Sequence, residues 1–212
     1  MCSINLTQKI AEIQNKLSKE IIKEDNFQRI ENVCGVDISF EKDNIATAAA
    51  VVIDYNTLKV LEEKTLKVEI QFPYLSGFLG FREVDGTTSV IKKLKNEYDV
   101  LMVNGHGIMH PRSFGLASHV GLLMDTPTIG VAKKLPPGKY KFKIVNGIKY
   151  ILSGNRTVGA YIKGKYISIG HKISLTTAIN VILKTSLFKM PEPVRKAHIL
   201  ATETMKNEIE IN

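Results

Sequence analysis

The chain has 212 residues, of which 44% are hydrophobic and 24% charged, as in an ordinary soluble globule. No apolar run approaches the roughly 18 residues that a membrane span needs. Residues 1–23 mix Lys and Glu with isolated apolar residues, which excludes a secretory signal. Cys2 and Cys34 form no CxxC pair, which excludes a disulfide framework or a zinc ribbon and suits a reducing cytosol. We therefore expect one cytoplasmic domain over residues 1–212, with no membrane partner.

The balance of charge is basic. Lys and Arg number 29 against 21 Asp and Glu, which gives a formal net charge of +8 and a sequence pI near 9.3. An excess of this size fits a polyanionic partner, because each Lys or Arg near a phosphate releases a counterion on binding. It equally fits a solvated, lysine-rich surface. Charge alone does not decide between a nucleic-acid partner and no such partner.

The first half of the chain begins with a helical pattern and continues with strands. Residues 4–23 place apolar side chains at spacings of three and four, which predicts an amphipathic helix. Three apolar or alternating runs follow at 33–40, 46–54 and 58–68, and short polar turns separate them. Such a series predicts an antiparallel three-strand meander. Helical spacing returns over 77–98, after Pro73.

The second half alternates strands with helices. Residues 100–103 form a β-rich run that ends at Asn104 and Gly105, and a loop rich in Gly and His follows. A short helix is expected over 117–124 and a buried strand over 128–132. Residues 141–172 suggest two or three further strands, and two helices, at 175–184 and 194–208, close the chain. This order predicts an α/β fold in which helices flank a mixed sheet like that of the ribonuclease H-like nucleases.

Three polar residues lie at positions where a polar side chain calls for a structural or functional explanation. Asp37 lies inside an apolar strand, and a buried carboxylate is costly unless a cation or hydrogen bonds compensate it; the alternative is a surface-facing strand position. Glu83 follows Phe81 and Arg82 early in a helix, where it also suits a helix dipole or a surface ion pair. Asn104 ends a buried strand, the place where α/β sheets bind ligands, although Asn-Gly is also an ordinary turn signal.

The context of these residues resembles the endonuclease V family. The resemblance extends over five blocks in the family's order, namely 35–40 (GVDISF), 72–83 (FPYLSGFLGFRE), 103–119 (VNGHGIMHPRSFGLASH), 127–134 (PTIGVAKK), and 191–198, which contains Pro191-Glu192-Pro193, Arg195 and His198. These blocks span most of the chain. The resemblance implies a ribonuclease H-like fold and a metal-dependent nuclease that acts on inosine, the deaminated form of adenosine.

The resemblance also implies a metal site. Asp37 and the residue at 104 would bind Mg²⁺ directly, with Mn²⁺ as a substitute, and Glu83 would act largely through water. Lys133 would lie near the cleaved phosphate, where a cation offsets developing charge, although it could be a solvated lysine. His198 would contact the phosphate or the metal's shell, although it could be a surface histidine. These five residues are the expected catalytic set.

The base would be recognised by other residues of the matched blocks. By resemblance, residues 73–76 form a wedge that fills the gap left by a flipped base, and Tyr74 suits stacking unless it is packed in the core. Glycines would let main-chain groups approach the purine edge. The expected base-binding residues are Pro73, Tyr74, Leu75, Gly77, Leu79, Gly105, Gly107, Gly115, Leu116, Gly130 and Ala132. His110 and His119 could support this site or simply stabilise loops.

One position departs from the family pattern. The family has aspartate where this sequence has Asn104, which lowers the charge of the three-residue cluster from about −3 to −2 and weakens Mg²⁺ binding. Three explanations are open: a deliberate replacement that traps a substrate complex, a natural loss of activity with base binding kept, and a natural, tolerated neutral ligand.

The sequence therefore leads to one expected function and two alternatives. We expect a monomeric, inosine-directed endonuclease that cuts DNA or RNA 3′ to the deaminated base, leaving a 3′-hydroxyl and a 5′-phosphate, and is impaired by Asn104. The first alternative is a non-cleaving protein that recognises deaminated bases. The second is an RNA-binding protein without lesion preference.

Overall fold

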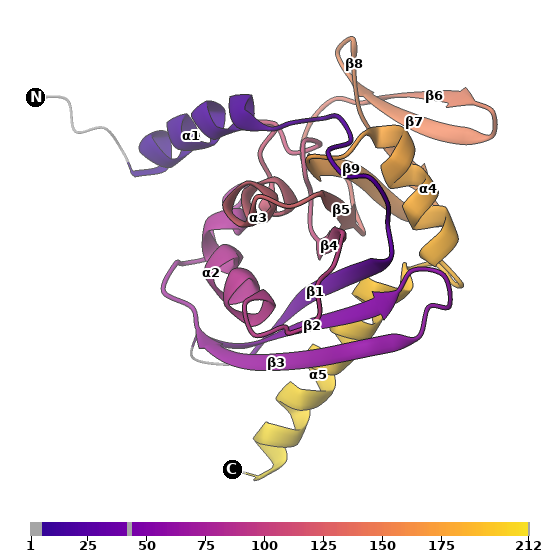
Figure 1. Cartoon of the computed structure of the whole chain (residues 1–212). Helices are drawn as coiled ribbons and strands as arrows, with labels where there is room; N and C mark the ends of the chain where they lie inside the picture. Colours follow the sequence, from indigo (N-terminus) through magenta and orange to yellow (C-terminus); the bar gives the residue numbers. More distant parts are fainter. Residues whose placement is uncertain (1–5, 42–43, 212) are drawn as a thin grey trace, which may run out of the picture.

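The computed structural model describes residues 6–41 and 44–211, with side chains described up to residue 207 (Figure 1). Its helices and strands follow the expected chain order closely. In sequence they are α1 (Leu6–Leu17), a 3-10 turn (Ser18–Glu20), β1 (Asn32–Phe40), β2 (Ile45–Asp54), β3 (Val60–Glu69), α2 (Leu79–Ile91), β4 (Val100–Asn104), α3 (Leu116–Met124), β5 (Thr128–Ala132), β6 (Lys141–Val145), β7 (Ile148–Ser153), β8 (Arg156–Ile162), β9 (Lys165–His171), α4 (Leu175–Thr185) and α5 (Glu192–Ile211).

All nine described strands form one mixed sheet, in the order β3-β2-β1-β4-β5-β9-β8-β7-β6. Strands β1, β2 and β3 form the expected antiparallel meander, while β4 runs parallel to β1 and β5 runs parallel to β4. The remaining strands are antiparallel to their neighbours. The predicted fold class, a ribonuclease H-like mixed sheet flanked by helices, is confirmed.

Two expectations for these elements are wrong, a number of strands and the extent of a helix. Residues 141–172 contain four strands rather than two or three, because tight turns at Gly147, Gly154 and Gly164, all at positive φ, fold the segment back three times. The helix expected over 77–98 begins at Leu79 and ends at Ile91. Its apolar spacing continued further because Leu94 and Tyr98, although outside the helix, still pack on the core.

The expected N-terminal helix is also shorter than residues 4–23. Its first two positions lie outside the described residues, and α1 gives way to a 3-10 turn at Ser18. Ile21 has extended backbone, and the next residue, Ile22, donates its N–H to His171 on β9. The chain therefore leaves the helix in order to pair with the sheet.

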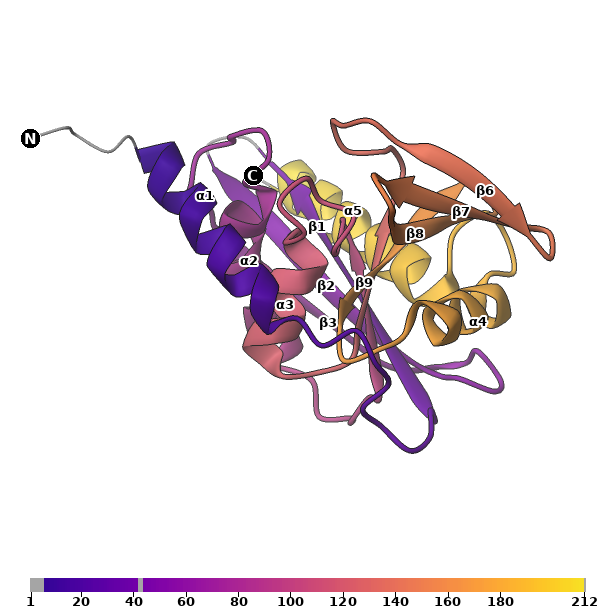
Figure 2. The same cartoon turned by 90° about the horizontal axis from the view of Figure 1, so that it is seen from above.

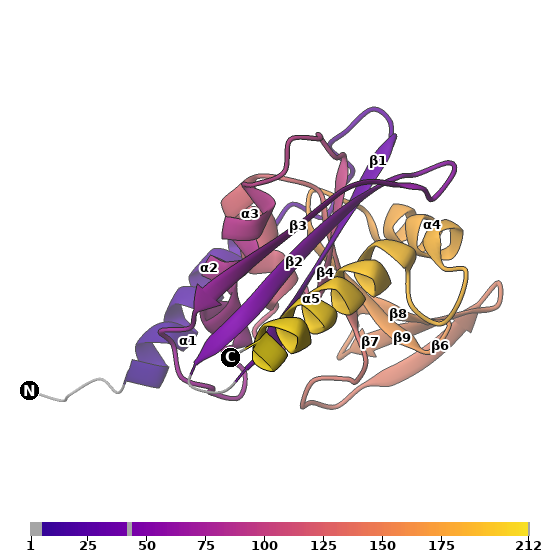
Figure 3. The same ribbon diagram turned by 90° about the horizontal axis from the view of Figure 1, so that it is seen from below.

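Helices cover both faces of the sheet (Figures 2 and 3). Helices α4 and α5 pack on one face, where Val181, Ile182 and Ala197 join strand residues in the largest buried cluster. Helices α2 and α3 pack on the other face with a second cluster that includes Val84 and Val120. Helix α1 runs along the α2–α3 side (Figure 2). The carboxyl ends of β1, β4 and β5 lie between these layers.

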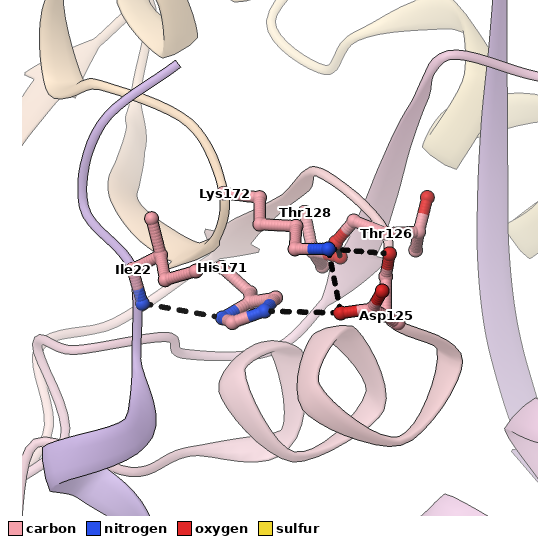
Figure 4. A network of polar contacts seen from close by, with 6 residues as sticks. All are labelled: Ile22, Asp125, Thr126, Thr128, His171 and Lys172. Carbon is pink, nitrogen blue, oxygen red and sulfur yellow. Dashed lines mark hydrogen bonds and ion pairs between the residues drawn. The ribbon is translucent and has the colours of Figure 1, made fainter. Parts of the chain in front are cut away.

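A polar network fixes the opposite edge of the sheet (Figure 4). Asp125, which ends α3 in a left-handed conformation, pairs with Lys172 at 2.6 Å and lies 3.8 Å from Nε2 of His171. Nδ1 of His171 accepts the N–H of Ile22. Burial and the nearby Lys172 charge lower the pKa of His171. The network joins the N-terminal segment, α3 and β9 on the side away from Asn104.

Among the described residues, none of the helices combines the length and the apolar character that crossing a bilayer requires.

Candidate active site

The register of the parallel strands brings the candidate catalytic residues to one edge of the sheet. Val36 on β1 is paired with Val103 on β4, so the next residues, Asp37 and Asn104, are neighbours. Asn104 in turn is paired with Val131 on β5. Because parallel strands end at the same edge, residues that follow them in sequence meet there. Three sequence segments far apart in the chain therefore converge at this point.

Asp37 is held from two sides. Nδ2 of Asn104 donates a hydrogen bond of 2.8 Å to Oδ1 of Asp37. Nδ1 of His198, on α5, donates to Oδ2 at 2.5 Å. The carboxyl group is about nine-tenths buried, whereas the imidazole is 41% exposed. A carboxylate can only accept these bonds, so His198 carries its proton on Nδ1. The site thus contains a desolvated carboxylate with a fixed orientation.

Glu83 adds a second buried carboxyl group. It lies in the first turns of α2 and is 9% exposed. Burial, and secondarily the negative charge of Asp37, raise the pKa of Glu83 to about 8, and Arg82 offsets only part of this rise. Helix α2, which carries Glu83, packs against β1, which carries Asp37. Two desolvated acids in one place favour either a shared proton or a bound cation.

The donor set suits a hard divalent cation. Carboxylate oxygens of Asp37 and Glu83 and the amide oxygen of Asn104 are the ligand types that Mg²⁺ prefers. Among the side chains that the structure describes, over 6–41 and 44–207, no three His, Cys, Asp or Glu gather as a metal-binding group. A cation here would therefore depend on the neutral Asn104 as its third protein ligand, or on water and substrate oxygens.

Lys133 is carried by the segment that follows β5. It follows directly on Ala132, the last residue of β5, and it is exposed. The next residue, Lys134, accepts a hydrogen bond of 2.8 Å on its carbonyl from Nε2 of His106, in the loop after β4. The backbone that carries Lys133 is therefore tied to the loop that follows Asn104.

A cavity of about 410 Å³ opens beside this edge. It is bounded by the loop before α2, the loop after β4, the start of α3 and the segment after β5. Tyr74 is at its rim with 70% of its surface exposed. Of the expected base-binding residues, it brings together Tyr74, Leu75, Gly77, Leu79, Gly115 and Leu116, together with His110. His106 also lines it, two residues beyond Asn104.

Other expected base-binding residues do not line this cavity, namely Pro73, Gly105, Gly107, Gly130 and Ala132. Two of these glycines are enclosed by main chain. A Cβ on Gly107 would lie 1.9 Å from the carbonyl oxygen of Ile169, and one on Gly130 would lie 2.6 Å from that of Gly105. The close packing of strands and loop explains the absence of a side chain at both positions.

His119 does not line the cavity either. It is buried between α2 and α3, and its ring lies 5.1 Å from the ring of Phe81 and 5.2 Å from that of Phe114. Burial lowers the pKa of His119, which favours the neutral ring. His119 therefore packs against aromatic side chains outside the cavity, and its role as a loop-stabilising residue stays a prediction.

Sequence reasoning missed Gln14. Its side chain on α1 is 1% exposed, and Nε2 donates to the carbonyl oxygens of Phe114 at 3.0 Å and Gly77 at 3.4 Å. Oε1 accepts from Nε of Arg112 at 2.5 Å. Arg112 itself donates to the Gly77 carbonyl at 2.6 Å and lies over the ring of Phe78. The sequence contained one signal for this residue, which is that an amide side chain lies on the apolar side of the predicted helix.

His110 completes this network. Nε2 donates to the carbonyl oxygen of Gly77 at 3.1 Å, and Nδ1 accepts the N–H of Arg112 at 3.3 Å. Burial, and secondarily the charge of Arg112, lower the pKa of His110 to about 4. The ring is therefore neutral at pH 7. Gly77, in the loop that carries Tyr74, thus accepts bonds from Gln14, His110 and Arg112.

Comparison with known proteins places this arrangement in a family. The Endonuclease V family model matches residues 15–199. Endonuclease V from Dictyoglomus thermophilum is 44% identical over 206 residues, which cover 93% of this chain and 90% of that protein. The solved structure of a Bacillus subtilis Endonuclease V superposes with a TM-score of 0.90 at 25% identity, covering 99% of this chain and 96% of that one.

A third comparison concerns a complex. Ciona intestinalis Endonuclease V, solved with a 24mer DNA containing an inosine followed by a ribo-adenosine, is 28% identical. It superposes with a TM-score of 0.82 and covers 94% of this chain and 99% of its own. Because the family model matches most of the chain and the curated relatives align along nearly their whole lengths, the chain belongs to the Endonuclease V family.

Proposed function

We propose that this chain recognises inosine in DNA or RNA and hydrolyses the second phosphodiester bond 3′ to it. The observation that carries the proposal is the position of the cavity beside the buried acids. His106 lines the cavity two residues after Asn104, and Asn104 is bonded to Asp37. A base held in the cavity would therefore place its neighbouring phosphates near the two acids. The Ciona relative in complex with inosine-containing DNA supports this substrate class.

The cavity suits a flipped purine. Its volume of about 410 Å³ lies within the range of small-molecule sites, and its lining combines apolar residues such as Leu75 and Leu79 with polar ones such as His106. Tyr74 at the rim can stack in the space that the base leaves. Hypoxanthine carries a carbonyl acceptor at its six position, where adenine carries an amine donor. A main-chain N–H directed at this position would accept the first base and reject the second.

The acids suit hydrolysis of a phosphodiester. The oxygen of water forms a bond to phosphorus, and the bond between phosphorus and the 3′ oxygen breaks. One product then ends in a 3′-hydroxyl, and the other begins with a 5′-phosphate. Asp37 and Glu83 would hold Mg²⁺, which polarises the phosphate and activates water when bound. His198 holds the Asp37 carboxylate in place. The exposed Lys133 can offset charge that develops on the phosphate.

Asn104 should impair this reaction without removing recognition. With an amide in place of a carboxylate at position 104, the cation site has one negative charge less. The N–H of this amide already donates a hydrogen bond to Asp37. The cavity walls do not include residue 104. The chain should therefore bind inosine well and cut slowly. Mn²⁺, which accepts neutral donors more readily, should support more cleavage than Mg²⁺.

The hydrogen bond between Asn104 and Asp37 also favours one alternative function, that of a non-cleaving protein that recognises deaminated bases.

The test is to incubate the chain and its Asn104→Asp variant with end-labelled DNA and RNA that carry a single inosine, and to map the products. Adenine at the same position is the control. Cleavage at the second phosphodiester 3′ to inosine by the variant supports the nuclease. Inosine-specific binding by both proteins without any cutting would establish the rival.

A further inference from the structure

A groove lies between the β8–β9 turn and the connection from α4 to α5. It is open, has a volume of about 760 Å³, and is lined by Tyr161, Lys163, Gly164, Leu187, Phe188 and Lys189. None of these described lining residues is acidic, and the exposed Lys163 and Lys189 make the groove positively charged. No described residue lines both this groove and the cavity proposed for the base. We call it the Phe188 groove.

The groove exposes apolar surface on a backbone that is held in place. Leu187 is 62% exposed and Phe188 is 66% exposed. Among the aromatic side chains that the structure describes, only that of Tyr74 is more exposed. The preceding residue, Ser186, is buried, and its carbonyl oxygen accepts a hydrogen bond of 2.5 Å from Nζ of Lys163. This bond joins the two walls of the groove, so the exposed ring lies beside a lysine at a defined place.

The β8–β9 wall lies at the same edge of the sheet as the candidate catalytic residues. Ala132, at the end of β5, is paired with Tyr166 on β9, and Tyr166 is paired with Tyr161 on β8. Lys163 comes two residues after this row, at the edge where Lys133 follows β5. Strands β5 and β8 are separated by two strand spacings of about 4.8 Å. The groove therefore begins roughly 10 Å from the end of β5.

The other wall leads to the same edge through α5, which lies with α4 on one face of the sheet (Figure 3). The guanidinium of Arg195 lies 5.8 Å from the ring centre of Phe188. His198 is three residues further along α5 and is bonded to Asp37. Residues three apart are neighbours on a helix surface, so side chains lead without a break from Phe188 to Asp37. Glu192 is bonded to Arg195 and its side chain is 4% exposed, so it presents no free charge to the groove.

We propose that the Phe188 groove holds an unpaired nucleotide of the substrate strand, on one flank of the active site. Its base stacks on the ring of Phe188, and its phosphates contact Lys163 and Lys189. A ring face beside cations, without acids, is the combination that surfaces for single strands use. The distance of roughly 10 Å from the end of β5 corresponds to about three nucleotide steps of 3.4 Å. A strand that passes the catalytic residues therefore reaches the groove.

The inference rests on the proposed function, because that function supplies the strand. Every base has a face that can stack, so the contact increases affinity for any sequence and leaves the choice of inosine to the cavity.

The test compares the exposed phenylalanine of the groove with one on the other face of the sheet. Phe188→Ala should weaken binding to a short single-stranded oligonucleotide with one inosine by about 5- to 100-fold, the range for one lost base stack. Phe188→Trp should keep the affinity, because a ring face remains. The control is Phe142→Ala, at a position 52% exposed on β6. Phe142 is paired with Ile151, and the adjacent Tyr150 packs on the α4–α5 side, so Phe142 points to the opposite face.

The charge of the groove is tested through the salt dependence of the same affinity. Lys189→Gln should lower the slope of log affinity against log salt by about 0.7, as expected for one lost phosphate contact with a single strand. Lys92→Gln removes the same charge from an exposed position at the end of α2 and should leave the slope unchanged. Equal changes of slope in the two variants, or none in either, would overturn the phosphate contact.

Three results would overturn the stacking contact. The first is an unchanged affinity of Phe188→Ala, and the second is an equal loss of affinity in Phe142→Ala. The third is a dimer that dissociates on Phe188→Ala while the affinity for the oligonucleotide stays the same, which would assign the groove to a second copy of the chain. Sedimentation of the free protein measures that state.

Two further substrates separate this inference from the proposed function. Oligonucleotides that end next to inosine, on the 3′ or on the 5′ side, should abolish the effect of Phe188→Ala in one case only, and an effect that persists with both would contradict the flanking contact. An oligonucleotide with adenine in place of inosine should lose affinity by the same factor on Phe188→Ala. Failure of the proposed function would instead appear as equal affinity of the unsubstituted chain for inosine and adenine.

Discussion

Asn104 and Asp37 are joined by a hydrogen bond of 2.8 Å, in which the amide of Asn104 is the donor. An aspartate at position 104 could not donate this bond at neutral pH. It would bring a further negative charge to a place where burial, and secondarily the charge of Asp37, already raise the pKa of Glu83. The amide therefore stabilises the acids by an internal bond, in place of the cation that an aspartate would require.

The stability of the protein without metal should show whether the Asn104 amide stabilises the acids in place of a cation. Without divalent cations, Asn104→Asp should lower the free energy of unfolding by about 1–3 kcal/mol, the cost of losing a hydrogen bond to a buried charged group. Added Mg²⁺ should stabilise the variant more than the unsubstituted chain, since a ligand stabilises the state that binds it. Thermal melts with EDTA and with Mg²⁺ measure both. Asn96→Asp, at an exposed position, is the control and should change neither.

Tyr74 should contribute to binding by stacking. Tyr74→Ala should weaken binding to inosine duplexes by roughly 1–3 kcal/mol, the range for a lost base–aromatic stack. Tyr74→Phe should keep most of the affinity, because the ring face remains. The residue is 70% exposed, so neither change should affect the melting temperature. An unchanged affinity for Tyr74→Ala would show that this ring does not act as the wedge.

Gln14 should position the loop that carries Tyr74. Gln14→Leu removes the acceptor for Arg112 and the donor to Phe114, and each buried polar group left unpaired costs about 1–3 kcal/mol. We expect lower stability together with weaker discrimination between inosine and adenine duplexes. Gln8→Leu, at an exposed position of the same helix, is the matched control. Lower stability with unchanged discrimination would reduce Gln14 to a structural role.

Acid should destabilise the fold partly through His110. Its pKa in the folded protein is about 4, against an ordinary value of 6.5. Between these values the unfolded chain takes up a proton that the folded one refuses, so the stability contributed by the neutral ring is lost as pH falls. Arg112 and His106 face the ring and oppose its protonation. Denaturant unfolding from pH 7.5 to 4.5 should show a shallower pH dependence for His110→Gln; parallel curves would contradict this assignment.

The order of the elements was predictable from the sequence, and so was the choice of polar residues on buried strands as candidate site residues, because both depend on local signals. Asp37 interrupts an apolar strand, and Asn104 ends one. The partners of these groups were not predictable, since they depend on packing between distant segments. Gln14 and Phe114 are separated by 100 residues, and no pattern in α1 indicates that its one buried amide meets the loop after β4. The number of strands over 141–172 was underestimated because the three turns between them are only two residues long.

The prediction of the base-binding residues is limited for the same reason, because it too depends on packing between distant segments. Gly107 and Gly115 look alike in sequence, and a Cβ at either position would clash with main-chain atoms, yet only Gly115 also lines the cavity. Which glycines border the cavity follows from the fold and is not encoded in the local sequence.

The central claim is that residue 104 limits cutting and leaves recognition intact. Single-turnover cleavage of one inosine duplex, by the chain and by Asn104→Asp, tests it most directly. In Mg²⁺ the variant should cut about 100-fold faster or more, which corresponds to roughly 2.7 kcal/mol of transition-state stabilisation. The two affinities for the duplex should agree, and Mn²⁺ should narrow the gap in rate. Equal rates for the two proteins in Mg²⁺ would contradict the account and establish Asn104 as a competent ligand.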